Sequence, residues 1–313
     1  MTAPAGSSSG RRPKVIVDCD PGLDDAAALA IAGTYCELLG VTTVGGNAPL
    51  VDVTQNALIT LQVFGLDVEV YAGADRPLVQ APLHAPEIHG THGFAGPSLP
   101  ELRRQANETG AVEFIVDTVR KHDDVWLVPT GPLTNIALAL RLAPDIADRV
   151  AGISFMGGSA TIGNHTPVGE FNILADPEAA AMVLGCGAPI YMAGLDLTMQ
   201  FQVTDTLAEQ LQAVGTPGAM MLSELTVAYL DRVETIRGER RGGLHDPVAV
   251  LAVTHPELIR HTLRRVDVEL CGAHTRGMTV VDQRPRHRDD ANVWHGHHLD
   301  GAAALAVLLA AVS

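Results

Sequence analysis

The chain has 313 residues, and 47% of them are hydrophobic, which is enough apolar material for a sizeable buried core. Its formal net charge is −15, which argues against nucleic acid and against an anionic membrane, because both bind through clustered Lys and Arg. A small neutral ligand or a cation is the expected partner.

The two ends of the chain and its cysteines indicate where the protein works. Residues 1–13 contain a Ser/Gly run and two arginines but no apolar stretch, which predicts a disordered tail and not a signal peptide. The apolar run 301–313 is too short to span a bilayer and predicts a packed last helix. The four cysteines are scattered, form no C-x-x-C pair and are expected to be small buried hydrophobic residues in a reducing cytoplasm. They are Cys19, Cys36, Cys186 and Cys271.

From residue 14 onward, short β-branched runs alternate with helical patterns, and no linker interrupts them. The expected strands lie at 14–20, 38–47, 124–131, 150–158 and 188–196, and the clearest helices at 24–33, 51–65 and 132–144. This alternation predicts one α/β domain over residues 14–313, with an open, mostly parallel sheet and helices on both faces. Ligands of such sheets bind beyond the carboxyl ends of the strands, so the candidate site residues should follow the strands.

Three segments depart from this alternation. Residues 80–100 carry several Pro, Gly and His without periodicity, which predicts a long loop and a candidate lid. Residues 264–286 predict an antiparallel pair of strands at one edge of the sheet. The histidines at 295, 297 and 298 invite a transition-metal interpretation, but their spacing favours a final edge strand followed by Asp300 as a helix cap.

Four aspartates lie within the eight residues DCDPGLDD. Because side chains alternate along a strand, Asp18 and Asp20 should point to one face, and the Pro-Gly turn then leads to Asp24 and Asp25 in a first helical turn. Either of the last two alone could be an ordinary helix cap. As a group, however, these carboxylates repel one another unless a cation or shared protons neutralise them, and a hard divalent metal is the simplest explanation.

More than one class of protein carries an aspartate cluster of this kind. An EF-hand does not fit, because Leu29 stands at the twelfth loop position, where a bidentate Glu is required. A metal-dependent phosphatase with an aspartyl nucleophile is a more serious alternative. The sequence lacks the Gly-rich loop and lysine that would cradle a phosphate. A non-catalytic, metal-stabilised ribose-binding protein is a further alternative.

Polar groups also follow other predicted strands. Thr130 precedes a Gly-Pro turn, which leaves backbone carbonyls free to face a ligand. His245 and Asp246 precede a proline, and Asp-Pro is also typical of a helix N-cap, as expected at Asp176. The stretch 163–172 carries amide and carboxyl groups suited to sugar hydroxyls, and a plain loop is its alternative interpretation.

Six motifs in this order resemble the nucleoside hydrolases of the inosine-uridine preferring type. They are DCDPGLDDA (18–26), TTVGGN (42–47), IHGTHG (88–93), PTGPLTNIA (129–137), GNHTPVGEFN (163–172) and HDPVAV (245–250). The resemblance covers nearly the whole chain from Lys14. It implies calcium-dependent hydrolysis of the N-glycosidic bond of ribonucleosides to free base and ribose, a role in purine or pyrimidine salvage, and a homo-oligomer, with a tetramer favoured over a dimer.

The resemblance also implies roles for individual residues. Asp20, Asp25, Asp246 and the backbone carbonyl of Thr130 would bind the calcium ion. Asp24, Asn47, Met156, Asn164, Glu170 and Asn172 would contact the ribose, and His89 and His245 would face the base. Asp18 has no role in this pattern.

The same assignment implies a mechanism. Asp20 would activate a metal-bound water as general base, and cleavage would pass through an oxocarbenium-like transition state. His245 is the expected general acid, with a pKa suited to neutral pH, and His89 is the weaker candidate. The alternatives are that His245 only orients Asp246 and that His89 is a surface residue.

The base preference stays open at the level of sequence. Relatives often place aromatic side chains shortly before the His-Asp pair, whereas residues 231–246 contain none and Tyr229 lies just upstream. Trp126 and Trp294 offer no clear counterpart of a tryptophan-lined purine site. The His89 and His245 pair resembles the inosine-uridine and pyrimidine-preferring branches.

Overall fold

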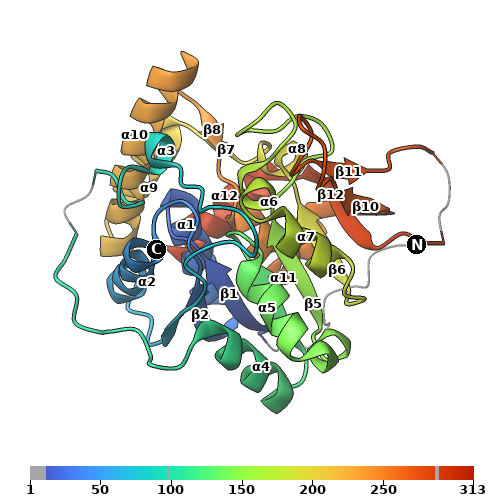
Figure 1. The fold of residues 1–313 in the computed structure, drawn as a ribbon. Helices are drawn as coiled ribbons and strands as arrows, with labels where there is room; N and C mark the ends of the chain where they lie inside the picture. Colours follow the sequence, from blue (N-terminus) through green and yellow to red (C-terminus); the bar gives the residue numbers. More distant parts are fainter. Residues whose placement is uncertain (1–11, 97–98, 286–288) are drawn as a thin grey trace.

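An eight-stranded sheet with the order β3-β2-β1-β4-β5-β6-β12-β9 forms the centre of the computed structural model, which describes residues 12–96, 99–285 and 289–313 (Figure 1). Its strands are β1 (Lys14–Cys19), β2 (Glu37–Thr43), β3 (Val70–Ala72), β4 (Val125–Pro129), β5 (Gly152–Met156), β6 (Ile190–Ala193), β9 (Ile259–Arg264) and β12 (Val293–Leu299). All neighbours pair in parallel except β12 and β9. The predicted α/β fold with a mostly parallel sheet is therefore confirmed.

Helices cover both faces of this sheet. They are α1 (Leu23–Tyr35), α2 (Leu50–Val63), α3 (Pro86–His89), α4 (Ala111–Lys121), α5 (Thr134–Leu142), α6 (Phe171–Ala175), α7 (Pro177–Leu184), α8 (Leu195–Thr198), α9 (Asp205–Val214), α10 (Pro217–Arg237), α11 (Pro247–Thr254) and α12 (Gly301–Ala311), with 3-10 turns η1 (Pro144–Asp148) and η2 (Pro256–Leu258). One hydrophobic cluster joins the sheet to α1, α2 and α9 to α12. A second joins it to α4, α5 and α7.

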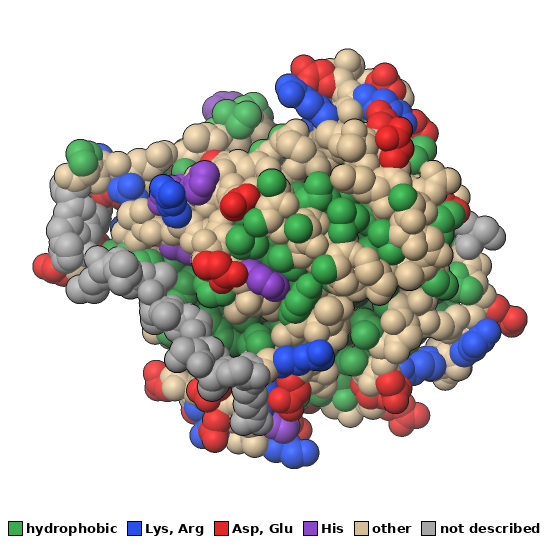
Figure 2. Space-filling view, turned by 180° about the vertical axis from the view of Figure 1, so that it is seen from behind, with side chains coloured by type: hydrophobic (Ala, Val, Ile, Leu, Met, Phe, Trp, Pro, Cys, Tyr) green, Lys and Arg blue, Asp and Glu red, His purple; other side chains and the backbone are tan. Residues whose placement is uncertain are grey.

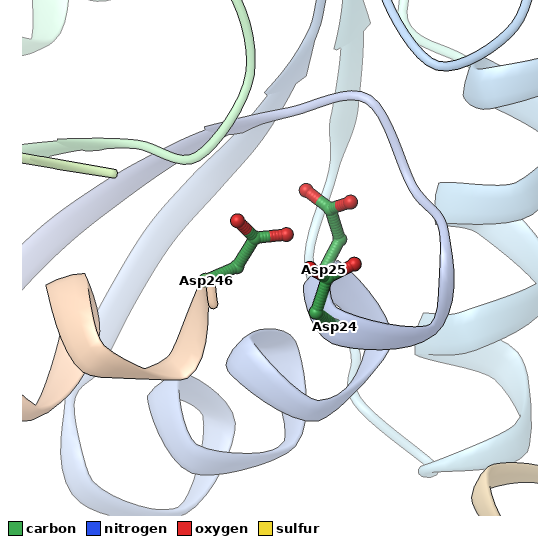
Figure 3. A group of neighbouring side chains, drawn as sticks. All are labelled: Asp24, Asp25 and Asp246. Carbon is green, nitrogen blue, oxygen red and sulfur yellow. The ribbon is translucent and has the colours of Figure 1, made fainter. Parts of the chain in front are cut away.

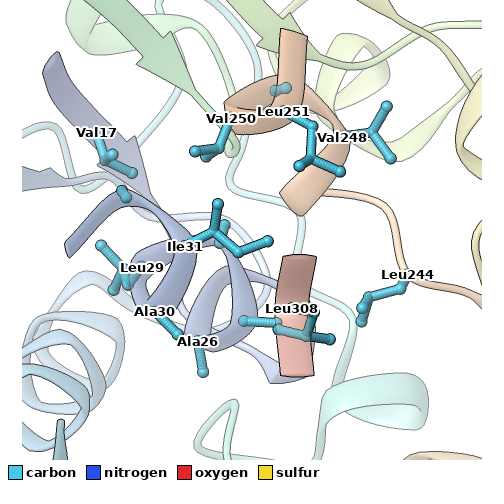
Figure 4. Packing of buried hydrophobic residues seen from close by; sticks show 14 of the residues in the cluster. Val17, Ala26, Leu29, Ala30, Ile31, Leu244, Val248, Val250, Leu251 and Leu308 are labelled. Atoms are coloured by element: carbon cyan, nitrogen blue, oxygen red, sulfur yellow. The ribbon is translucent and has the colours of Figure 1, made fainter. Parts of the chain in front are cut away.

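Strand β1 lies in the middle of the sheet, and its apolar sequence follows from that position. Val15, Ile16 and Val17 are fully buried, as expected for a parallel strand covered on both faces. Helix α1 then packs its alanine-rich surface against α11 and α12, with Ile31 and Leu308 among the contacts (Figure 4). Each large apolar side chain buried in this way stabilises the fold by roughly 1.5–3 kcal/mol.

Two predicted strand positions need correction. The small antiparallel edge that the sequence predicts is confirmed, but β9 and β12 form it. The predicted pair within 264–286 is antiparallel, but β10 (Val266–Val268) and β11 (Thr279–Val281) form a separate two-stranded sheet. A third sheet pairs β7 (Gln202–Val203) with β8 (Gly242–Gly243). The histidine-containing strand β12 is not an edge strand, because β9 adds to its outer side and becomes the edge. The predicted cap at Asp300 is confirmed by its hydrogen bond from the Ala303 amide.

The predictions for the cysteines, the long loop and the tail have mixed outcomes. Cys19 and Cys36 are buried as expected, but Cys186 is half-buried and Cys271 is exposed, so the expectation of four buried cysteines is wrong. Residues 80–96 are irregular apart from the single turn of α3. The predicted disordered tail lies, up to residue 11, outside the described residues.

The surface gives two further observations. In the part of the chain that the structure describes, no helix combines the length and the apolarity that a membrane span requires. The face in Figure 2 carries hydrophobic and uncharged groups across its middle, and most of its Lys, Arg, Asp and Glu lie toward the rim.

The strand order identifies where a ligand should bind. From β1 the chain adds β2 and β3 on one side of the sheet, and from β4 onward it adds strands on the other side of β1. Strands β1 and β4 are therefore neighbours, although two further strands separate them along the chain. The crevice at the carboxyl ends of such a pair is the usual ligand site of open α/β sheets. The aspartate-rich turn follows β1 and Thr130 follows β4, so both reach this crevice.

Candidate active site

A pocket of about 260 Å³ opens at this crevice and gathers most of the predicted residues. Ten of the twelve candidates line it. These are Asp24, Asn47, His89, Thr130, Met156, Asn164, Glu170, Asn172, His245 and Asp246. The remaining two, Asp20 and Asp25, are buried next to lining residues, since Asp20 bonds Asn47 and Asp25 bonds Thr130.

Three carboxylates from two distant segments lie close together (Figure 3), and two of them, Asp24 and Asp246, line the pocket. Asp24 and Asp25 stand in the first turn of α1, Asp246 precedes α11, and one oxygen of each lies within 4.8 Å of the others. The Asp25 carboxylate accepts hydrogen bonds from the Gly22 amide at 3.0 Å and from the Thr130 hydroxyl at 2.8 Å. Among the described residues this is the group of acidic, His or Cys side chains spaced to hold a metal ion.

Asp246 does not serve as the helix cap that its Asp-Pro context allowed. Its side chain accepts no capping hydrogen bond from α11, and its carboxylate faces Asp25 instead (Figure 3). The similar pair at Asp176 does cap its helix, accepting from the Ala179 amide at 3.1 Å. The same dipeptide thus has a structural role at one position and lines the site at the other.

Asp20 is held close to this group but is not one of its three members. Its Oδ2 accepts from the Asn47 amide at 2.7 Å, and the Asn47 side chain donates to the Asp20 carbonyl at 3.0 Å. A Cβ atom on Gly46 would lie 2.0 Å from Oδ2, and one on Gly131 would lie 2.6 Å from Oδ1. Glycine is therefore required on both sides of this carboxylate.

The electrostatics of the cluster favour a cation. Burial, followed by the charges of neighbouring carboxylates, raises the pKa of Asp25 to about 6 and the pKa values of Asp20 and Asp246 well above their usual range. Burial also raises the pKa of Asp24 to about 6. Within the described residues, Asp20 Oδ1 and Asp24 Oδ1 are buried without a hydrogen-bond partner. Buried carboxylates of this kind fit a hard divalent ion, which takes carboxylate and carbonyl oxygens as ligands.

Asp18, which had no assigned role, lies behind the site. Its Oδ1 accepts hydrogen bonds from the Thr42 hydroxyl at 2.6 Å and from the Asn135 amide at 2.7 Å. Its backbone carbonyl accepts from the Thr130 amide at 2.8 Å. Asp18 therefore ties β1 to β2 and to the segment that follows β4, and it does not line the pocket.

The side-chain amides of Asn47 and Asn172 both donate hydrogen bonds to backbone carbonyls. Asn172 donates to the Thr130 carbonyl at 2.6 Å and to the Met156 carbonyl at 3.2 Å, while Asn47 donates to Asp20. With their N–H groups engaged by the backbone, each amide keeps its oxygen as an acceptor at the pocket wall. Acceptors are the groups needed to bind hydroxyl donors.

Glu170 and Asn164 line the pocket and also fasten its wall. Glu170 caps α6, accepting from the amides of Asn172 at 3.0 Å and Ile173 at 3.1 Å. Asn164 Oδ1 accepts from the Phe171 amide at 2.9 Å. The segment 163–172 is therefore an ordered wall whose polar side chains keep further donor and acceptor capacity for a ligand.

The two candidate histidines also line the pocket, and their pKa values differ from the sequence expectation. Burial lowers the pKa of His89 to about 4, and burial together with the charges of Arg237 and His89 lowers the pKa of His245 to about 4. A pKa suited to neutral pH is thus the wrong expectation for His245. At pH 7 its neutral ring offers one N–H donor and one acceptor nitrogen.

Gly22 controls the position of His89. A Cβ at Gly22 would lie 2.4 Å from His89 Nδ1, so Gly22→Ala is expected to push this ring out of its place. We expect Gly22→Ala to lower kcat/KM for a hydrolysed nucleoside to about the same extent as His89→Ala, with little additional loss in the double variant. Steady-state kinetics of the three variants measures this coupling. Fully additive losses would show that the two residues act independently.

Several residues that line the pocket were not predicted from the sequence. Tyr229, Ile236 and Arg237 of α10 line it, together with Glu87, Ile88, His165 and Phe171. Tyr229 lies seven residues before Ile236, which places both on one face of a helix. That spacing within the 21-residue helix α10 was the available signal, and Tyr229 supplies the aromatic group that residues 231–246 lack.

The sequence is similar to a family of known enzymes along most of its length. A model of the family described as inosine-uridine preferring nucleoside hydrolase matches residues 15–306. The chain is 44% identical over 278 residues to a protein of that name from Leishmania major, covering 87% of this chain and 88% of the relative. It is 39% identical over 273 residues to a pyrimidine-specific ribonucleoside hydrolase, RihB, from Escherichia coli, covering 86% and 87%.

Solved structures agree with this similarity. A purine-preferring ribonucleoside hydrolase from Gardnerella vaginalis superposes with a TM-score of 0.89 at 33% identity, covering 96% of this chain and 98% of that one. A plant nucleoside hydrolase, PpNRh1, gives 0.87 at 28% identity, covering 96% and 98%. The chain belongs to the inosine-uridine preferring nucleoside hydrolase family and is a hydrolase that acts on N-glycosyl bonds.

Proposed function

We propose that this protein hydrolyses ribonucleosides to free base and ribose with a calcium ion in its site. The observation that carries this proposal is one pocket whose lining combines two chemically different sets of groups. One set consists of carboxylates and amide oxygens, which are suited to a cation and to sugar hydroxyls. The other set consists of two histidines and Tyr229, which are suited to a planar base.

Calcium is the proposed ion because every candidate ligand is an oxygen. Asp20, Asp25 and Asp246 would hold it through carboxylates and Thr130 through its carbonyl, and calcium accepts six to eight such ligands. When bound, the ion would orient ribose hydroxyls and increase the acidity of water in the site. Asp24, which shares the carboxylate group and lines the pocket, is proposed to hold the ribose hydroxyls.

The side chains of the protein would then divide the reaction between them. Asp20 takes a proton from the water that attacks C1′ of the ribose, and the electron pair of the C1′–N bond leaves with the base. The buried carboxylates and the oxygens of Asn47 and Asn172 stabilise the positive charge that develops on the sugar. His245 donates a hydrogen bond from the N–H of its neutral ring to the leaving base, which stabilises the electron pair that arrives there, and the departed base takes its proton from solvent water.

The base preference has no single supporting observation. The similar proteins named above are described as inosine-uridine preferring, pyrimidine-specific and purine-preferring. We propose inosine and uridine as the first substrates to test, because the protein from Leishmania major bears that name at the higher identity. A cytoplasmic location, a role in nucleoside salvage and a homotetramer remain predictions.

A nucleoside panel tests the function. We expect sugar release, measured as reducing ends, from at least one of inosine, adenosine, guanosine, uridine and cytidine. Release of inorganic phosphate from nucleoside monophosphates without sugar release would support the phosphatase alternative instead. Binding of a nucleoside by calorimetry with no turnover would support the ribose-binding alternative.

A further inference from the structure

We propose that Thr198 is a positioning residue, which fixes the ring of His245 so that Nε2 is the nitrogen that meets the leaving base. This inference rests on the proposed function, and it adds a residue that does not line the pocket. It also assigns a task to α8 and to the histidine-containing strand β12.

The direct contact is short and buried. Thr198 is fully buried at the last position of α8, and its Oγ1 lies 2.7 Å from His245 Nδ1. In the described part of the chain, the His245 ring is the hydrogen-bond partner of this hydroxyl. Because Thr198 occupies Nδ1, the ring nitrogen left for a ligand is Nε2.

The close approach of Gly243 also restricts the position of the His245 ring. A Cβ on Gly243 would lie 2.6 Å from Cε1 and 3.1 Å from Nε2 of His245, so the backbone there contacts the edge of the ring. The 2.7 Å contact alone allows either group to donate, and in the proposed arrangement the Thr198 hydroxyl is the donor. A hydroxyl that donates to Nδ1 of a neutral imidazole leaves the proton on Nε2. With this assignment, Thr198 sets both the orientation of the ring and the nitrogen that carries its proton.

Helix α8 is held in place by β12. The Asp196 carboxylate accepts from the Ala160 amide at 2.9 Å and lies 2.8 Å from Nε2 of the buried His295. Gln200, just beyond α8, donates to the Asp196 carbonyl and accepts from the Leu299 amide. His295 thus lies within ion-pair distance of the helix that carries Thr198, and the hydrogen bonds of Gln200 join that helix to β12.

The orientation of the His245 ring matters because negative charge develops on the leaving base. As the C1′–N bond breaks, its electron pair moves onto the base, and an N–H aimed at the base becomes more favourable as that charge grows. A ring free to turn over would spend part of its time with an acceptor facing the base. Loss of the Thr198 hydroxyl should therefore lower kcat and leave KM nearly unchanged.

Three variants and two substrates test the proposal. We expect Thr198→Val, which keeps the side-chain shape, to lower kcat for a hydrolysed nucleoside by roughly 10- to 100-fold, which is less than the roughly 10²- to 10³-fold lost when a preorganised hydrogen-bond donor is removed outright. Thr198→Ser keeps the hydroxyl and should stay within about threefold of wild type. Thr60→Val is the matched control, since Thr60 is equally buried and its hydroxyl bonds only the Asn56 carbonyl at 2.8 Å within the described residues.

A second substrate distinguishes a positioning role of Thr198 from a role in folding. In 4-nitrophenyl riboside the leaving group departs as a stable phenolate and needs no N–H donor, so Thr198→Val should hydrolyse it within about threefold of wild type. Equal losses on both substrates, or an unchanged kcat on the nucleoside, would overturn the proposal. If wild-type protein cleaves the aryl riboside but no nucleoside, the proposed function itself is wrong, and the positioning role of Thr198 is then wrong as well.

Discussion

Replacing Asp20 with asparagine is expected to abolish sugar release while leaving the protein folded. The variant keeps the size of the side chain and an oxygen that can accept from the Asn47 amide, but it cannot take a proton from water. General base catalysis contributes roughly 10²- to 10⁴-fold, and loss of a proposed metal ligand adds to this effect. The measurement is kcat/KM for the best nucleoside of the panel, with thermal unfolding followed in parallel.

Asp176→Asn is the matched control for this prediction. Asp176 is also fully buried, accepts hydrogen bonds from the Ala179 and Leu78 amides and from the Thr134 hydroxyl, and does not line the pocket. We expect this variant to lose about 1–3 kcal/mol of stability, because one carboxylate oxygen that accepts buried donors is replaced by an NH₂ group, and to keep normal turnover. Near-normal turnover in Asp20→Asn would show that the general base has been misassigned.

Removing the metal is expected to stop the reaction and to lower the melting temperature. An ion that binds the folded protein alone stabilises it by RT ln(1 + [L]/Kd), which is about 2.7 kcal/mol at a hundredfold excess over Kd. Calcium added to protein stripped with a chelator should therefore raise the melting temperature progressively and restore sugar release. Magnesium should restore less, because it demands near-octahedral geometry and shorter bonds.

The variant Asp246→Asn provides the control for metal removal. With one carboxylate fewer, it should show a smaller shift of the melting temperature on addition of calcium, at any concentration short of saturation. Titration by differential scanning fluorimetry measures both proteins side by side. Full-rate sugar release from thoroughly stripped protein would exclude a calcium-dependent mechanism.

Much of the fold follows from local patterns along the chain. The apolar run of β1 and the alternation with α1 and α2 are sufficient to predict a parallel sheet, because each pattern reports the burial of its own segment. The position of β12 is different. Whether β12 lies at the edge depends on β9, which precedes it by about 30 residues and pairs with it through backbone hydrogen bonds that side-chain patterns do not report.

The candidate site was also predicted partly from local sequence and decided partly by tertiary packing. The carboxylates that follow β1 predict a cation from the sequence alone, because their mutual repulsion is a property of their spacing. The sequence could not decide whether Asp246 caps α11, since the same Asp-Pro dipeptide does cap a helix at Asp176. Packing of α11 beside α1 decided it by bringing the Asp246 carboxylate to Asp25 (Figure 3).

By itself, therefore, the sequence determined the α/β class, the strand-end location of the site and the residue types that make it acidic. Only the tertiary structure decided which groups face one another. It lowered the pKa of His245 to about 4 by burying the ring, brought Tyr229 and Arg237 of α10 to the pocket, and placed Thr198 against Nδ1 of that ring. The physical reason is that desolvation and hydrogen bonding between distant segments depend on three-dimensional contacts, which local sequence patterns do not encode.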